Sequence, residues 1–302
     1  MSLLVVGSIA IDRVETPYGS TAGELGGSAV YFSFAASHFT PVRVVGVVGQ
    51  DFPDAYLARL ASRPIDLEGL QRAEGATFRW HGAYEGRMDE ARTVAVQMNV
   101  LGSHEPAIPA GYADSHYVFL ANGPPAGHAR ALSQLRRPRF VMADTMNYYI
   151  ANERPALLDL MQRVDAMIMN DREALQLSGR PNLLAAARWV CEHGPAHCII
   201  KKGEHGSLLR GPAGTFVLSG FPHEAVVDPT GAGDAFAGGM MGYLASRQDL
   251  GPQTMRLALA YGTVMASFAI EQFGLKGLEG LNTEAIEARM AEFIRSTHLF
   301  GA

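Results

Sequence analysis

The residues best suited to chemistry lie in a glycine-rich segment, residues 226–244, with the sequence VVDPTGAGDAFAGGMMGYL. Gly231, Ala232 and Gly233 are small enough to let backbone N–H groups approach an anion closely. The residues from Asp234 onward have the pattern of a helix, whose positive dipole end would lie at the same point. Such a cluster of donors suits a phosphoryl group that develops negative charge, and the Asp234 carboxylate could accept the proton of an attacking hydroxyl. The alternative for Asp234 is a plain N-cap.

A sheet elsewhere in the chain must position these residues. Short apolar, β-branched-rich runs alternate with helical patterns, which favours an α/β fold with a mostly parallel central sheet and helices on both faces. A polar or glycine residue comes after each run, and in an open parallel sheet such positions share one edge, where ligands bind. The sequence therefore predicts a single cleft. The predicted strands span residues 3–6, 42–48, 116–120, 140–143, 166–169 and 198–201, and the residues that come after strands are Gly7, Asp12, Asn122, Asp144, Asn147, Asn170 and Gly203.

Two segments interrupt this alternation. Residues 76–100 are rich in Thr, Val and aromatic residues and contain a turn near residues 86–89, which predicts a β-hairpin outside the main sheet. Residues 13–24 are also extended and could pair with the hairpin. Together they predict a small β lid, inserted in a single domain of residues 1–302, that excludes water from the cleft. The alternative is an ordinary hairpin at the sheet edge. The side chains that could reach a ligand from the lid side are Phe32, Trp80, Tyr84 and Gln97, although packing within the protein is the favoured role of the aromatic ones.

Charge and composition exclude several classes of function. The chain has 25 Lys and Arg against 30 Asp and Glu, a net charge of −5, and no basic tract, so nucleic acid is not an expected partner. No apolar stretch approaches about 18 residues, and the chain begins directly with a strand pattern, which predicts no membrane span and a cytoplasmic location. Cys191 and Cys198 are too few for a disulfide framework. With His193 and His197 they flank a helix-to-strand connection, so we favour no metal site there.

The segment from Asp228 to Asp234 resembles the C-terminal signature of the ribokinase-like PfkB family of carbohydrate and nucleoside kinases, D-T-x-G-A-G-D, and departs from it only at Pro229. Other motifs of this family follow in order along nearly the whole chain. The resemblance implies a ribokinase-like fold and an ATP-dependent phosphotransferase that acts on a primary hydroxymethyl group of a sugar or sugar derivative. These motifs are the pair Gly26-Gly27 with Ser28, VGVVGQDF at residues 45–52, N-x-x-E at residues 170–173 and KKGEHGSLL at residues 201–209.

The resemblance also implies roles for the residues that could take part in catalysis and metal binding. Asp234 would be the catalytic base, and Gly231, Ala232 and Gly233 the anion hole. Asn170 and Glu173, three residues apart at a helix start, share a face and would organise Mg²⁺ through its waters. A capping box between them is the alternative, and both roles are compatible. Asp228, with carbonyls around Phe273 and Gly274, is the candidate site for a monovalent cation, K⁺.

The remaining candidate residues fall into two groups, one for each substrate. The resemblance places the nucleotide on the loop at residues 202–206 and against a helix at residues 255–269, and the acceptor on Asp12 and the glycine pair. Ser28 stands where many sugar-kinase relatives have Asn, and its shorter hydroxyl offers fewer hydrogen bonds. The nucleotide-binding candidates are Asn170, Lys202, Gly203, Glu204, Gly206 and Thr230, and the acceptor candidates are Asp12, Gly26, Gly27, Ser28, Asn122 and Asp144.

Two alternatives to a sugar kinase remain. An aromatic lid would suit a nucleoside as well as a sugar, so a nucleoside kinase of the same family is the first. The second is a sensor that binds nucleotide or sugar without turnover, since a fold does not prove a function, although the intact Asp234 argues against it. A homodimer through the β lid is a further prediction.

Overall fold

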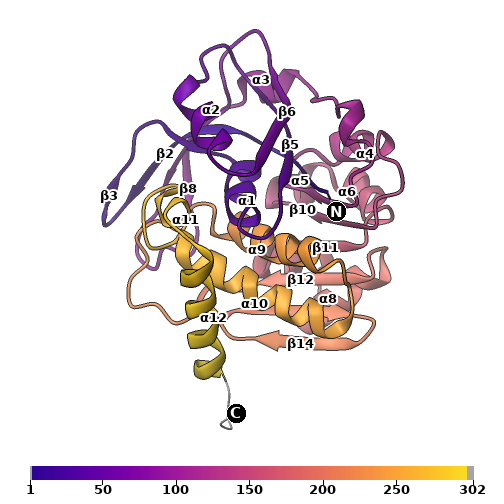
Figure 1. The fold of residues 1–302 in the computed structure, drawn as a ribbon. Coiled ribbons are helices and arrows are strands. Elements are labelled where there is room, and N and C mark those ends of the chain that lie inside the picture. The colour runs from indigo at the N-terminus through magenta and orange to yellow at the C-terminus, as the bar shows by residue number, and fades with distance from the viewer. Residues whose placement is uncertain (1, 298–302) are drawn as a thin grey trace.

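Nine strands form the main sheet of the computed structural model, which describes residues 2–297 (Figure 1). The strand order is β14-β13-β12-β11-β10-β9-β1-β5-β6, parallel from β6 to β12 and antiparallel at β13 and β14. The predicted α/β fold with a mostly parallel sheet is confirmed. The strands are β1 (Leu3–Val6), β5 (Val42–Val48), β6 (Ile65–Arg72), β9 (Tyr117–Leu120), β10 (Phe140–Asp144), β11 (Ala166–Asn170), β12 (His197–Lys201), β13 (Ser207–Gly211) and β14 (Gly214–Leu218).

Both faces of the sheet are covered by helices, which explains why its strands are continuous apolar runs. Leu3 and Val5 of β1 point into one core, and Leu4 and Val6 point into the other. The first core is closed by α1 (Ser28–Ala36), α9 (Ala232–Arg247), α10 (Pro252–Ala269) and α12 (Thr283–Thr297), of which the last three lie in front of the sheet in Figure 1. The second core is closed by α4 (Pro125–Ser133), α6 (Arg154–Met161), α7 (Asp171–Ser178) and α8 (Leu183–Glu192).

Short elements complete the main domain: α2 (Asp54–Ala61), α3 (Asn99–Ser103), α5 (Asn147–Asn152), α11 (Lys276–Glu279) and the 3₁₀ turns Ala110–Tyr112 and Gly203–His205. The edge strand β6 was not among the predicted strands. Its sequence, IDLEGLQR, places Asp66 and Glu68 in the strand, and an edge strand with a partly exposed face does not form an apolar run.

A second sheet holds both segments that interrupt the alternation. It consists of β2 (Ala10–Thr16), β3 (Gly19–Ser20), β4 (Glu24–Gly26), β7 (Arg79–Ala83) and β8 (Arg92–Gln97). The expected pairing occurs, because β2 runs parallel to β7 and β7 forms an antiparallel hairpin with β8. The end of the predicted hairpin segment is different, since helix α3 begins at Asn99. The function of this sheet as a lid stays a prediction.

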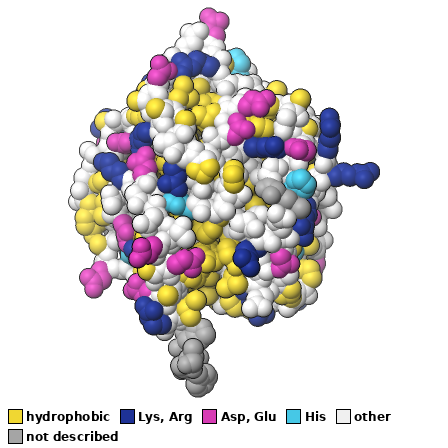
Figure 2. Space-filling model, viewed as in Figure 1, with side chains coloured by type: hydrophobic (Ala, Val, Ile, Leu, Met, Phe, Trp, Pro, Cys, Tyr) yellow, Lys and Arg dark blue, Asp and Glu magenta, His cyan; other side chains and the backbone are white. Residues whose placement is uncertain are grey.

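The surface shows charges of both signs. On the face in Figure 2, Lys and Arg side chains are interspersed with Asp and Glu side chains. Within residues 2–297, no helix has the length and apolar character needed to cross a membrane.

Candidate active site

The glycine-rich segment forms the start of α9, as expected, but the helix begins two residues earlier than Asp234. Gly231 is the N-cap, with φ at +75°, and the ring of Tyr31 occupies the place where a Cβ of residue 231 would lie. Both the backbone angle and the close ring therefore require glycine. Asp234 is the third residue of the helix and makes no capping hydrogen bond. The N-cap interpretation of Asp234 is wrong, and its carboxylate is free for other contacts.

The environment of Asp234 raises the pKa of its carboxyl toward neutral pH. The pKa of Asp234 is raised to about 7, mainly by burial and also by the charge of Asp144, while the ammonium of Lys201 acts in the opposite direction. A carboxylate with a pKa near the working pH is well matched to proton transfer.

Lys201 is the residue of this cluster that our sequence analysis missed. It is the last residue of β12, and its Nζ lies 3.1 Å from Oδ2 of Asp144. Burial disfavours the charged ammonium, but the neighbouring carboxylates outweigh it and raise the pKa of Lys201 above its ordinary value. The available signal was position: Lys201 is the last residue of a predicted strand, and Asn170 directly follows another. Asp144, a predicted acceptor ligand, is the ion-pair partner of Lys201, and its acceptor role stays a prediction.

Asn170 and Glu173 form the capping box that was the alternative interpretation, at the start of α7. The backbone N–H of Glu173 donates to Oδ1 of Asn170 (2.8 Å), and the backbone N–H of Asn170 donates to Oε2 of Glu173 (2.7 Å). Burial and the charge of Asp144 raise the pKa of Glu173.

A hydrated divalent cation fits this region by charge, because the carboxylates of Asp144, Glu173 and Asp234 face the single ammonium of Lys201. In the described part of the chain, no group of three or more His, Cys, Asp or Glu side chains is arranged to hold a metal ion directly. A cation here would therefore be held through its waters. The Mg²⁺ role of Asn170 and Glu173 stays a prediction.

Asp12, a predicted acceptor ligand, lies close enough to this cluster for the charge of Asp234 to affect its pKa. It is in the middle of β2, not at the end of the first strand as predicted, because β1 ends at Val6 and the chain turns before it enters the second sheet. Its carboxylate lies directly over Gly26, where no side chain would fit. Burial raises the pKa of Asp12 to about 7, the backbone N–H of Gly27 opposes this, and the charges of Asp228 and Asp234 add to it. The structure thus brings Asp12 and the proposed base to one site.

The other acceptor candidates have partners within the protein. Gly27 is the N-cap of α1 with φ at +97°. The backbone N–H of Ser28 donates to Oγ of Ser8 (3.1 Å), and the two hydroxyls are 3.0 Å apart. The Nδ2 group of Asn122 donates to Sδ of Met146, while its Oδ1 is buried and has no hydrogen-bond partner among the described residues.

The aromatic candidates separate into two groups. Trp80 is the register partner of Asp12 in the parallel β2–β7 pair, so both side chains point to the same face of the second sheet. The hydroxyl of Tyr84 accepts a hydrogen bond from Oγ1 of Thr230 (3.2 Å). Phe32, by contrast, is fully buried in α1 and stacks on Phe119 with ring centroids 4.4 Å apart. Phe32 therefore packs within the protein, the role favoured for the aromatic candidates, because α1 is part of the core.

The predicted nucleotide loop lies beside the tip of the β7–β8 hairpin. Residues 203–205 form a 3₁₀ turn, with Gly203 and Gly206 in left-handed conformations. Glu204 forms an ion pair with Arg87 of the hairpin tip, and Glu90 of the tip forms another with Arg172 of α7. The hairpin tip therefore contacts two of the elements to which nucleotide-binding residues were assigned, the loop at residues 202–206 and α7.

Asp228 connects the glycine-rich segment to the loop after α10 through two hydrogen bonds. Its Oδ1 accepts from the backbone N–H of Thr230 (2.9 Å) and its Oδ2 from the backbone N–H of Gly274 (3.0 Å). Gly274 thus meets Asp228 through its N–H, and the role of Asp228 and the nearby carbonyls in binding a monovalent cation stays a prediction.

Comparison with known proteins places this site in a family. The family model for pfkB carbohydrate kinases matches residues 2–279. The chain belongs to the pfkB family of carbohydrate kinases. The protein is accordingly an ATP-dependent kinase of the carbohydrate and nucleoside class, and the family resemblance seen in its motifs is confirmed.

Individual relatives differ in the acceptor that their names give. A cytidine kinase of Thermococcus kodakarensis is 31% identical over 255 residues, 82% of this chain and 90% of the relative. A fructokinase from Vibrio cholerae O395, solved with fructose, ADP and potassium, has a TM-score of 0.79 at 17% identity and covers 96% of this chain and 98% of its own. A nucleoside kinase from Burkholderia thailandensis, solved with inosine, has a TM-score of 0.76 at 21% identity and covers 96% and 97%. At these identities the two solved structures show the shared fold.

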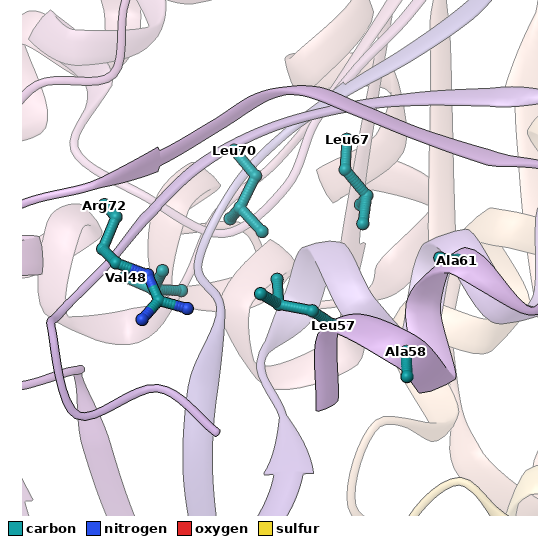
Figure 3. Close-up of a pocket in the computed structure, with 7 residues that line it drawn as sticks. All are labelled: Val48, Leu57, Ala58, Ala61, Leu67, Leu70 and Arg72. Carbon is teal, nitrogen blue, oxygen red and sulfur yellow. The ribbon is translucent and has the colours of Figure 1, made fainter. Parts of the chain in front are cut away.

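A cavity away from this site has no part in the chemistry described. It measures about 390 Å³ and lies between α2 and the edge strand β6 (Figure 3). Its lining is mostly apolar, with Arg72 as the one charged side chain, and none of the site candidates contributes to it. The lining residues are Val48, Leu57, Ala58, Ala61, Leu67, Leu70 and Arg72.

Proposed function

We propose that the acceptor of this kinase is a nucleoside, phosphorylated on the primary hydroxyl of its ribose. The observation that carries the proposal is the pairing of Asp12 with Trp80 on one face of the second sheet. A buried carboxylate can accept hydrogen bonds from two ribose hydroxyls, and an adjacent indole can stack on a base. The 31% identity to a cytidine kinase over 82% of the chain supports this choice.

The chemistry follows from the start of α9. Asp234 accepts the proton of the acceptor hydroxyl as its oxygen bonds to the γ-phosphorus and the bond between that phosphorus and the ADP oxygen breaks. The backbone N–H groups at Gly231, Ala232 and Gly233 stabilise the charge on the transferring group. Because the pKa of Asp234 is raised to about 7, the carboxyl formed by this proton transfer is stable at the working pH.

We also propose binding sites for two cations. Mg²⁺ would be held through water by Asn170 and Glu173, where it would neutralise phosphate charge, and chelation should abolish turnover. K⁺ would bind near Asp228 and the carbonyls around Phe273 and Gly274, so replacing KCl with choline chloride should lower the rate.

The nucleotide would lie on the loop at residues 202–206 and Thr230, next to α10. The ion pairs from Arg87 and Glu90 hold the hairpin tip beside this loop, which supports the lid function of the second sheet. By closing over both substrates, this lid would keep water from the γ-phosphate.

A sugar is the second candidate acceptor, because the matching family model is one of carbohydrate kinases. A panel of purine and pyrimidine nucleosides, ribose and fructose separates the two, with ADP formation as the readout. We expect kcat/KM for the best nucleoside to exceed that for any free sugar. A free sugar that is used better than every nucleoside would overturn the proposal, and ligand binding without ADP formation would favour the sensor.

The variant Trp80→Ala tests the same point within one protein. Stacking of a base on an aromatic side chain contributes about 1–3 kcal/mol, so kcat/KM for a nucleoside should fall about 5- to 150-fold. Activity on a free sugar should change little, since it has no base to stack. Tyr18→Ala is the matched control, because Tyr18 is 57% exposed in the turn between β2 and β3 of the same sheet.

We further propose a homodimer through the β lid and a cytoplasmic location. The edge strand β8 is exposed throughout, and Val94 (44%), Val96 (52%) and Met98 (44%) form an apolar group along it. Val94→Lys should convert a dimer to a monomer in light-scattering measurements. The supply of ATP and the free thiols of Cys191 and Cys198 agree with the cytoplasm.

A further inference from the structure

The ammonium of Lys201 lies beside Gly233, a residue of the proposed anion hole. A Cβ built on Gly233 would be 3.1 Å from Nζ of Lys201, so the absence of a side chain at residue 233 leaves the space beside the ammonium open. Gly233 directly precedes Asp234, and the charges of Lys201 and Asp234 influence each other. The positive charge is therefore close to both the amide donors and the proposed base.

Lys201 is also placed beside the proposed metal-binding residues. In the parallel β11–β12 pair it is the register partner of Asn170, so both lie at the same edge of the sheet. Among the described residues, the side-chain hydrogen bond that the structure gives to Nζ goes to Asp144 (3.1 Å). An ammonium has three N–H donors, which leaves two for a ligand.

Lysine is a rare residue type in this chain. The sequence contains three lysines, at positions 201, 202 and 276, against 22 arginines. Lysine carries a compact point charge, whereas the planar guanidinium of arginine needs more room. A compact ammonium fits beside the bare backbone of Gly233, where charge develops during phosphoryl transfer.

We propose that Lys201 is a catalytic residue that donates hydrogen bonds to the transferring phosphoryl group. In this role it adds a full positive charge to the backbone donors of residues 231–233. Asp144 is its positioning residue: it holds Nζ at the sheet edge until phosphate oxygens are present. The inference rests on the proposed function, because it needs the phosphoryl group at the start of α9.

The first test compares Lys201→Met with Lys276→Met. Lys276 is exposed on α11 and serves as the matched control. We expect Lys201→Met to lower kcat by about 10²- to 10³-fold, as for loss of one charge-stabilising donor, and Lys276→Met to leave kcat unchanged. Lys201→Met with more than half of the wild-type kcat would overturn the inference.

A second measurement separates a catalytic role from a structural one. ADP with aluminium fluoride mimics the transferring phosphoryl group, so Lys201→Met should lose at least tenfold more affinity for this complex than for ADP alone. A merely structural lysine would lower both affinities equally. If Lys201→Met does not fold, Lys201→Gln, which keeps one donor group, is measured in the same way. Equal losses for the two ligands would refute the proposal.

Asp234→Asn distinguishes this inference from the proposed function. Loss of activity in Asp234→Asn with full activity in Lys201→Met would refute the role of Lys201 alone. Full activity in Asp234→Asn would refute the proposed function itself. In the Asp144→Asn variant, a further Lys201→Met change should cost less than it does in the wild type, because the two residues act together.

Discussion

Replacing Asp12 with Asn should stabilise the protein at pH 8 while impairing its activity. Asp12 is 5% exposed, and burial is the main cause that raises its pKa from 3.8 to about 7. A carboxyl with a raised folded-state pKa has no effect on stability below its unfolded pKa, and it destabilises the fold increasingly as the pH rises from about 4 to about 7. The difference, 7 − 3.8 or about 3 pKa units, sets an upper limit of about 4 kcal/mol. Water in the cleft lowers this electrostatic penalty, so we expect Asp12→Asn to raise the free energy of unfolding by about 1–3 kcal/mol at pH 8.

Thermal unfolding of Asp12→Asn at pH 5 and pH 8 measures this effect. At roughly 2 °C per kcal/mol for a chain of this size, Tm should rise by about 2–6 °C at pH 8 and by less at pH 5. Asp159→Asn, at an exposed position of α6, is the control. The same sample should lose about 10²-fold in kcat/KM for the acceptor and keep its ATP affinity within about threefold. A variant that is less stable at both pH values and has normal acceptor kinetics would show that Asp12 only supports the second sheet.

Three further predictions concern the start of α9. Asp234→Asn should lower kcat by about 10²- to 10⁴-fold and leave ATP affinity nearly unchanged, because the amide keeps the shape and loses the basicity; a near-normal kcat would exclude Asp234 as the base. Since only ionised Asp234 accepts a proton and its pKa is about 7, kcat/KM of the wild type should fall about tenfold per pH unit below pH 7, and a flat profile between pH 5 and pH 7 would contradict this. Gly233→Val should abolish turnover, because the valine Cβ would lie 3.1 Å from Nζ of Lys201 and its methyl groups would fill the phosphoryl site. The Tm of this variant should stay within a few degrees of the wild type. Wild-type turnover in this variant would remove the anion-hole argument.

Local patterns were sufficient for much of the fold and for the order of the motifs. The apolar runs of the parallel strands are visible in the sequence because those strands are buried on both faces. The capping box of Asn170 and Glu173 could be named as an alternative because its residues are three apart and depend on one turn of helix. The glycine-rich start of α9 was predicted for the same reason, although its boundary was misplaced by two residues because the left-handed Gly231 begins the helix earlier.

The contacts between distant segments were decided only by the tertiary structure. Lys201 meets Asp144 because two strand ends, 57 residues apart in sequence, lie at one sheet edge, and it meets Gly233 because α9 begins above that edge. Asp12 reaches the same site from a second sheet, and Phe32 is excluded from it by its place in the core. Strand order and register depend on which distant segments pair, and hydrophobic periodicity along one segment carries no information about its partner. The sequence by itself therefore determined which residues have the right chemistry, and the packing of the sheets and helices determined which of them act together.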